Sequence, residues 1–124
     1  MKKMPRPTDS ELAILQVLWK LGPSTVRQVY EALGSKGAYT TVLTIMKIMT
    51  EKGLIKPDKS RTTFVYSVTA PAETVKRRLV SDLLDRAFAG AAQELVMQAL
   101  ETSAASKQDL QAIRKLIEQM EKKS

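Results

Sequence analysis

Short hydroxyl side chains and a cation recur along residues 40–52 at the spacing of one helix face. The residues on this face are Thr40, Thr41, Thr44 and Lys47. Hydroxyl and ammonium groups can hydrogen-bond to base edges and phosphates in the DNA major groove, which is wide enough for one helix. The single acid of the segment, Glu51, falls in its last turn. Each residue also has an ordinary interpretation, because Thr40 is the expected N-cap and the others suit a solvated helix surface.

A second group of cations lies in and beside a predicted polar turn at residues 57–61. Its members are Lys56, Lys59 and Arg61. At the tip of a hairpin, these side chains could reach a neighbouring phosphate or the minor groove, although lone surface cations are often only solvated. Tyr39 directly precedes the hydroxyl-rich segment, and it could stack on a sugar or base or pack beside the turn.

The positive charge is concentrated in the first half of the chain. Residues 1–68 hold 11 Lys or Arg and 5 Asp or Glu, a net +6, out of +7 for all 124 residues. Such an excess favours a polyanionic partner, and solubility alone is the alternative explanation. The basic start at residues 1–7 is not followed by an apolar signal segment, and no apolar run is long enough to span a membrane. We therefore predict a cytoplasmic protein without membrane insertion.

Several kinds of chemistry are excluded by composition. The chain has no His and no Cys. Catalysis by imidazole or thiol, disulfides, and zinc or copper sites built on these ligands are therefore impossible. Asp82 and Asp85 stand among arginines and are interpreted as salt-bridge partners. We predict neither an enzyme, nor a cofactor, nor a metal site.

The elements that must position the hydroxyl-rich face are three short helices followed by a hairpin. Thr8 and Glu11 have the capping-box pattern that begins a first helix, which ends near residue 21. Ser24 is the predicted N-cap of a second helix at residues 25–33, and the third helix covers residues 40–52.

Two strands are predicted at residues 54–56 and 62–68, on either side of the basic turn. Trp19, Tyr30 and Phe64 fit core positions. Leu43 and Ile48 are apolar residues on the presumed outer face of the third helix, where they could contact a thymine methyl or pack on the hairpin. The element order is that of a winged helix-turn-helix.

The second half is predicted to be helical, with a helix from about residue 70, a break near Gly90, a shorter helix, and a last helix capped by Ser106. Its apolar residues are too few to form a comfortable core alone, so we predict burial against a second copy in a two-fold homodimer. The predicted dimer residues are Leu79, Leu83, Phe88, Leu95, Leu110, Ile113, Ile117 and Met120. The alternatives are packing onto the first half, or a last helix that lies on a membrane surface.

The predicted fold is mostly α with a small β-hairpin. It consists of a winged-helix DNA-binding domain at residues 1–70 and a helical dimerisation domain at residues 71–124. This composition of elements favours a homodimeric transcriptional repressor. A winged-helix adaptor that binds proteins instead of an operator is the alternative, and it would be expected to present an acidic or apolar outer face on the third helix.

Several segments, in their order and spacing, resemble the penicillinase repressor family, which includes the penicillinase, methicillin-resistance and copper-transport-operon repressors. These segments are TDSEL at 8–12, VLW at 17–19, YTTV at 39–42, KGLI at 52–55 and FVY at 64–66. The similarity extends over residues 7–122. It implies a dimeric repressor that binds a palindromic operator through its N-terminal winged helices.

The resemblance also implies possible routes of induction. In the penicillinase branch, a membrane sensor metalloprotease system responds to β-lactam, and the repressor is cut within its dimerisation domain. The corresponding positions here are Gln98 and Ala99, where staphylococcal members have Asn-Phe. The copper branch carries a C-terminal Cys motif, and the absence of Cys excludes copper sensing by that route.

Overall fold

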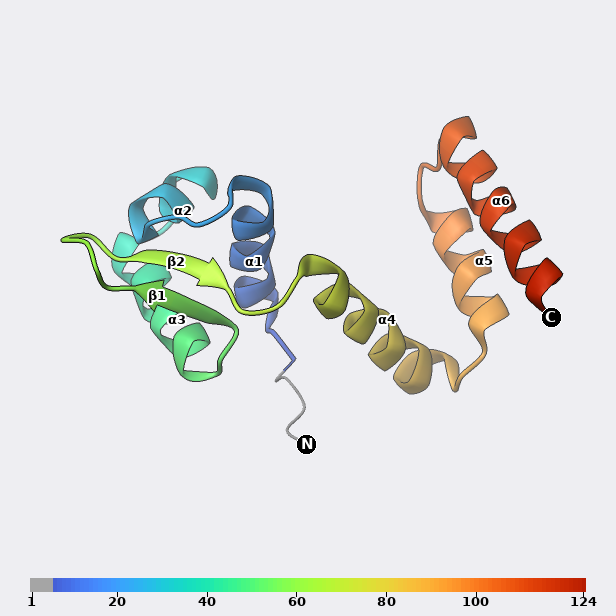
Figure 1. Cartoon of the computed structure of the whole chain (residues 1–124), viewed down its shortest axis with the longest axis horizontal. Coiled ribbons are helices and arrows are strands. Elements are labelled where there is room, and N and C mark those ends of the chain that lie inside the picture. Colours follow the sequence, from blue (N-terminus) through green and yellow to red (C-terminus); the bar gives the residue numbers. More distant parts are fainter. Residues whose placement is uncertain (1–5) are drawn as a thin grey trace. The chain divides into compact units, whose positions relative to one another are not determined.

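The computed structural model describes residues 6–124, and the start of the chain at residues 1–5 lies outside this range. The described part contains six helices and one antiparallel hairpin (Figure 1). Its contacts divide the chain into a first unit that ends at Leu79 and a second unit from Val80 to Ser124. No helix in this range is long and apolar enough to cross a membrane.

The first unit has the predicted order of three helices and a hairpin. The helices are α1 (Asp9–Leu21), α2 (Val26–Ala32) and α3 (Tyr39–Glu51), and the strands are β1 (Ile55–Asp58) and β2 (Val65–Val68). The two strands pair from Ile55 with Val68 to Asp58 with Val65. Helix α4 (Ala72–Phe88) follows and continues into the second unit. The winged helix-turn-helix predicted from the element order is confirmed.

One core holds the first unit together. Its most deeply buried side chains come from α1, α2, α3 and β1, and they are Ile14, Leu15, Val29, Met46, Met49 and Ile55. Burying each such side chain contributes roughly 1.5–3 kcal/mol. Val75 of α4 is also 4% exposed and belongs to this core, and Leu79 packs against it. The first two turns of α4 are therefore part of the first unit, which we call the head. The second unit, from Val80 to Ser124, is called the tail.

The loop before α2 differs from the prediction. Thr25, not Ser24, caps α2. The Thr25 hydroxyl accepts a hydrogen bond from the Gln28 amide, and the Gln28 side chain accepts a hydrogen bond from the Thr25 amide. Ser24 instead forms a β-bridge with Tyr66: each backbone amide donates to the other residue's carbonyl, at 3.0 and 2.8 Å. The hairpin is thus hydrogen-bonded directly to the segment that enters α2.

The start of α3 is also different. The helix begins at Tyr39, and Ala38 occupies the N-cap position without a side-chain hydrogen bond. The prediction that Thr40 is the N-cap is therefore wrong. Thr40 lies inside the first turn with an exposed side chain.

The two strands of the hairpin differ from the prediction in opposite ways, because the first extends further toward the tip and the second begins later. β1 extends through Pro57 to Asp58, and β2 begins only at Val65. Phe64 lies just outside the strand and is 42% exposed, so its assignment to the core is wrong. The Lys59 ammonium is 5.7 Å from the centroid of the Phe64 ring, a distance that permits a cation–π contact.

Trp19 fixes α1 against the start of α4. The ring is partly buried beside the core, and its indole nitrogen is buried without a hydrogen-bond partner among the described residues. The Lys76 ammonium lies 5.6 Å from the centroid of the ring. Trp19 is therefore a structural residue, as predicted.

The second unit contains the rest of α4, α5 (Ala92–Thr102) and α6 (Lys107–Lys123). Ser106 caps α6, as predicted, and the structure adds a reciprocal hydrogen bond from the Ser106 amide to the Asp109 side chain. Ala89 and Gly90 interrupt the helical conformation between α4 and α5, because both have positive φ angles, of 48° and 82°. No side chain of α5 or α6 is buried.

Candidate nucleic-acid interface

The outer face of α3 is open to solvent. Thr40, Thr41, Thr44 and Lys47 are all exposed, so the structure brings these predicted contacts together on one helix. The Thr44 hydroxyl donates to the Thr40 carbonyl at 2.9 Å. Because a hydroxyl oxygen carries two lone pairs, Thr44 can still accept a hydrogen bond from a ligand. This face can therefore offer one cation and several short hydrogen-bonding groups to a groove.

The two apolar residues on α3 have different environments. Leu43 is partly buried and packs against the core of the first unit, which accounts for its apolar character. Ile48 remains 41% exposed. Of the two, Ile48 is the more available for contact with an apolar group such as a thymine methyl.

Tyr39 packs beside the turn between α2 and α3. Its ring lies 5.6 Å from that of Tyr30 at an interplanar angle of 80°, an edge-to-face contact. The Tyr30 hydroxyl is 3.0 Å from the carbonyl oxygens of both Ser35 and Gly37, and its single proton serves these two acceptors. Of the two roles open to Tyr39, packing beside the turn is the one present in the structure.

The hairpin at residues 55–68, which we call the wing, exposes its cations to solvent. Lys56, Lys59 and Arg61 are all solvent-exposed. Asp58 shapes the tip, because its carboxylate accepts from the Ser60 hydroxyl at 2.7 Å and from the Ser60 amide at 3.0 Å. These hydrogen bonds lower the pKa of Asp58, so the carboxylate stays charged and the turn keeps its shape near neutral pH.

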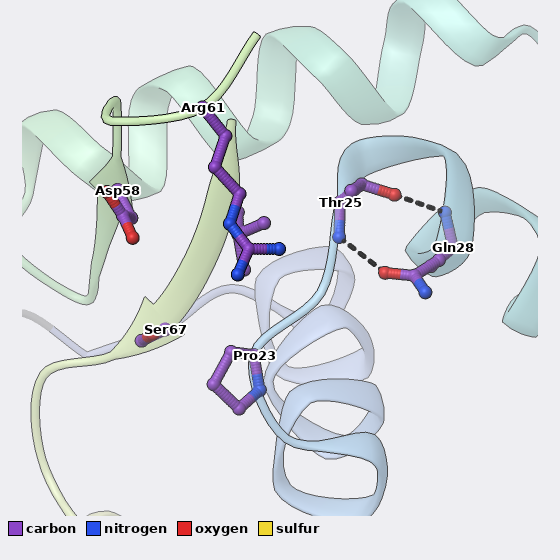
Figure 2. A pocket seen from close by; sticks show the side chains of 7 residues that line it. Pro23, Thr25, Gln28, Asp58, Arg61 and Ser67 are labelled. Atoms are coloured by element: carbon purple, nitrogen blue, oxygen red, sulfur yellow. Dashed lines mark hydrogen bonds between the residues drawn. The ribbon is translucent and has the colours of Figure 1, made fainter. Parts of the chain in front are cut away.

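Arg61 lines a hollow between the wing and the loop that leads into α2 (Figure 2). The hollow has a volume of about 510 Å³ and is lined by Pro23, Thr25, Gln28, Asp58, Arg61, Val65 and Ser67. In Figure 2 the Arg61 guanidinium points toward Thr25. Among the three wing cations, Arg61 therefore lies on the side of the wing that faces α2.

A partly buried ion pair joins α1 to the C-cap of α3. The Lys52 ammonium donates to the Glu11 carboxylate at 3.0 Å, and the Glu11 side chain is 3% exposed. Burial alone would raise the pKa of Glu11, but hydrogen bonds from the Thr8 amide and from Lys52 outweigh it and lower the pKa below its ordinary value. The sequence identified Glu11 only as a helix cap, because nothing local indicates a partner 41 positions away.

Within residues 6–124, no group of three or more Asp or Glu side chains could hold a metal ion. The exposed groups of α3 and the wing are mostly cations and hydroxyls, together with Ile48 and Phe64, and the two exposed carboxylates are Glu51 in the last turn of α3 and Asp58 at the wing tip. This fold and this surface define a winged helix-turn-helix protein of the DNA-binding kind.

The comparisons with known proteins agree with that class. The family model described as "Penicillinase repressor" matches residues 7–119, and the chain belongs to the penicillinase repressor family. The chain is 31% identical to the transcriptional regulator BlaI of Mycobacterium tuberculosis, over 98% of this chain and 89% of the relative. It is 23% identical to the penicillinase repressor of Bacillus licheniformis, over 96% and 94% of the two chains.

A solved structure is also similar to this chain. It is the solution structure of the Bacillus licheniformis BlaI monomeric form in complex with the blaP half-operator, with a TM-score of 0.50 and 27% identity. The match covers 59% of this chain and 92% of that one.

Proposed function

We propose that this chain represses transcription as a homodimer that binds a palindromic operator, with one α3 helix in each half-site. As a member of its family it is a DNA-binding transcriptional repressor. The observation that carries the proposal is the outer face of α3, where hydroxyls and Lys47 are exposed and Glu51 is confined to the last turn. A groove-facing helix needs such a surface, because carboxylates would repel the phosphates.

The roles of the individual residues follow from this placement. Thr40, Thr41, Thr44 and Lys47 would read base edges or bind phosphates in the major groove. Lys56 and Lys59 on the wing would bind backbone phosphates, and Arg61 would do so from the side that faces α2. Tyr39 would contribute chiefly by holding the turn before α3.

The solved relative supports a half-site arrangement. That protein is a monomeric form in complex with a half-operator. By analogy, one head of this chain would occupy one half-site, and two heads joined by their tails would occupy a full operator. Joining the heads raises the effective concentration of the second head at its half-site, so the dimer binds more tightly than either head alone.

The tail supports dimer formation. Leu83, Leu110, Ile117 and Met120 are 48%, 43%, 49% and 61% exposed. Phe88, Leu95 and Ile113 are partly exposed. A face with this much exposed apolar surface is typical of an interface that buries it. Leu79 differs from the other predicted dimer residues, because it packs against the core of the first unit.

We retain the division into a DNA-binding domain at residues 1–70 and a dimerisation domain at 71–124 as a functional proposal. The structural units part nine residues later, after Leu79, because the start of α4 packs on the head. A regulator that binds chromosomal DNA acts where the DNA is, so we place the protein in the cytoplasm.

Induction by proteolysis is a further part of the proposal. Gln98 and Ala99 are exposed on α5, and the Gln98 carbonyl accepts a hydrogen bond from the Thr102 hydroxyl at 2.7 Å. A protease of the membrane sensor system would need α5 to open locally at this bond, since helical backbone must unwind to enter a protease site. Cleavage there would separate α6 from the rest of the tail and weaken the dimer.

The test is a fluorescence-anisotropy titration of the purified chain against a labelled duplex from its own promoter region, with a scrambled duplex as the control. We expect preferential binding to the promoter duplex and a steep loss of affinity as salt rises. Lys47→Ala should weaken binding, and Arg61→Ala should reduce the salt dependence. Equal affinity for both duplexes, or no binding in dilute buffer, would contradict the proposal.

A further inference from the structure

Arg27 is a cation of α2 to which the sequence analysis gave no role. Its guanidinium carbon lies 4.5 Å from the centroid of the Tyr39 ring and 6.0 Å from that of the Tyr30 ring. Both distances are within the range of cation–π contacts. The Arg27 side chain is exposed, and no carboxylate pairs with it among residues 6–124, although Glu31 follows four positions later on the same helix.

The two aromatic rings that contact Arg27, those of Tyr30 and Tyr39, are held in place by their own contacts. Tyr30 and Tyr39 meet edge to face, and the Tyr30 hydroxyl is tied to the Ser35 and Gly37 carbonyls in the turn between α2 and α3. Arg27 is therefore held at the junction of the two helices, and its guanidinium loses less conformational freedom on binding than that of a freely rotating side chain.

The position of Arg27 suits a residue that binds the DNA backbone. Tyr39 is the first residue of α3, and the exposed Thr40 and Thr41 follow it directly. When the second helix of a helix-turn-helix enters the major groove, the first helix crosses the sugar–phosphate backbone. A guanidinium on that first helix, next to the start of the second, has the planar donor fork that binds a phosphate through two hydrogen bonds.

We propose that Arg27 binds a backbone phosphate of the operator beside the first turn of α3, and that Tyr39 and Tyr30 are the positioning residues for this interaction. The inference rests on the proposed function and adds one residue to the interface. It also explains why an exposed arginine is seated on two aromatic rings while the carboxylate four positions away does not pair with it.

The experiment measures operator affinity by fluorescence anisotropy at several salt concentrations, using the full-length wild type, Arg27→Ala, Arg27→Lys and Lys115→Gln. Lys115 is an exposed cation of α6 and provides a matched removal of charge. We expect Arg27→Ala to weaken affinity roughly tenfold at low salt and to reduce the log–log salt slope by about 0.9 for each phosphate that is no longer neutralised. Arg27→Lys should keep the slope and lower the affinity only in part, and Lys115→Gln should change neither.

The positioning role is tested by two substitutions of the ring that Arg27 approaches most closely. Tyr39→Phe keeps the ring face and should keep the affinity. Tyr39→Leu removes the ring face that supports Arg27 as well as the contact with Tyr30, and it should weaken binding more when Arg27 is present than in the Arg27→Ala background. The difference between the two backgrounds measures the coupling between Tyr39 and Arg27. Circular dichroism and thermal unfolding of each variant show whether the head remains folded.

The outcomes separate this inference from the proposed function. If Arg27→Ala weakens binding but leaves the salt slope unchanged, Arg27 acts only through the fold and the inference is overturned. If Arg27→Ala binds like the wild type, the inference is again overturned while the proposed function stands. If the wild type does not bind the promoter duplex, both fail together.

Discussion

The two units of this chain use their apolar residues in opposite ways. In the head, α1, α2, α3 and β1 direct their large side chains into one core, and Val29, Met46 and Met49 are completely buried. In the tail, α5 and α6 bury no side chain, and Leu116 and Met120 are 55% and 61% exposed. The head is a domain with its own core, whereas α5 and α6 of the tail leave large apolar side chains exposed.

This difference shows how stability and association are divided along the chain. The head draws its stability from contacts within one chain, so that stability is independent of concentration. The tail exposes apolar surface and buries no side chain of α5 or α6, so in the proposed dimer its stability would depend on protein concentration. The predictions below test this division, from the largest expected effect to the smallest.

The sharpest test places a carboxylate at a buried methionine of the head and at an exposed methionine of the tail. Met46→Asp buries a charge without a partner, at a cost comparable to the whole stability of a small domain, so we expect the head to unfold. Met120→Asp should leave the head folded. Circular dichroism and the near-ultraviolet signal of both variants check this, and a folded Met46→Asp variant would contradict the proposed core.

The second test acts on the tail. Ile117→Glu should convert a dimer to monomers, because a two-fold interface repeats the charge in both copies; we expect the dissociation constant to rise at least about a hundredfold. Light scattering coupled to size exclusion measures the mass. Lys115→Gln, on the same helix, is the control that should remain dimeric. A wild type that is already monomeric at working concentrations would remove the basis of this prediction.

The third test concerns the partly buried ion pair between Glu11 and Lys52 in the head. Because the pKa of Glu11 is lowered by folding, its stabilising effect is present above the unfolded value of about 4.5 and disappears as the pH falls through the lower folded value. Glu11→Gln removes this titration. We expect the melting temperature of the wild type to exceed that of the variant at neutral pH, and the gap to narrow on acidification. A gap that is constant from pH 7 to pH 3 would contradict the assignment.

The smallest effect is expected at the break between α4 and α5. Gly90 has a φ of 82°, and its added Cβ would meet no neighbour within 4 Å. Gly90→Ala therefore introduces only backbone strain, about 1–2 kcal/mol. Hydrogen exchange should show faster opening around residues 88–92 with unchanged protection in α1 and α3. Increased exchange in the head would show that this break is not confined to the tail.

Much of the fold was predictable because its signals are local. The capping box at Thr8, the N-cap at Ser106, the break near Gly90 and the order of three helices and a hairpin all follow from neighbouring residues. The exposed face of α3 was predictable for the same reason, since helical spacing alone determines which residues share a side.

The features that the sequence did not reveal depend on distant partners. Ser24 reads as a cap, but its backbone pairs with Tyr66 across the head. Phe64 fits a core position in the sequence pattern, but it lies just before the start of β2, where the Lys59 ammonium approaches its ring. Arg27 looks like an ordinary surface cation until its distance to Tyr39 is known. In each case tertiary contact decided between local options of similar energy, and no pattern in one sequence encodes that decision.

Trp19 gives the molecule a built-in reporter. It is the single tryptophan of the chain, and it belongs to α1 while the Lys76 ammonium of α4 lies over its ring. If the start of α4 separates from α1, the Trp19 indole becomes exposed to water and loses its contact with Lys76. We therefore expect the tryptophan fluorescence emission to shift to longer wavelength. The packing of the first turns of α4 against α1 can thus be followed optically in the unlabelled protein.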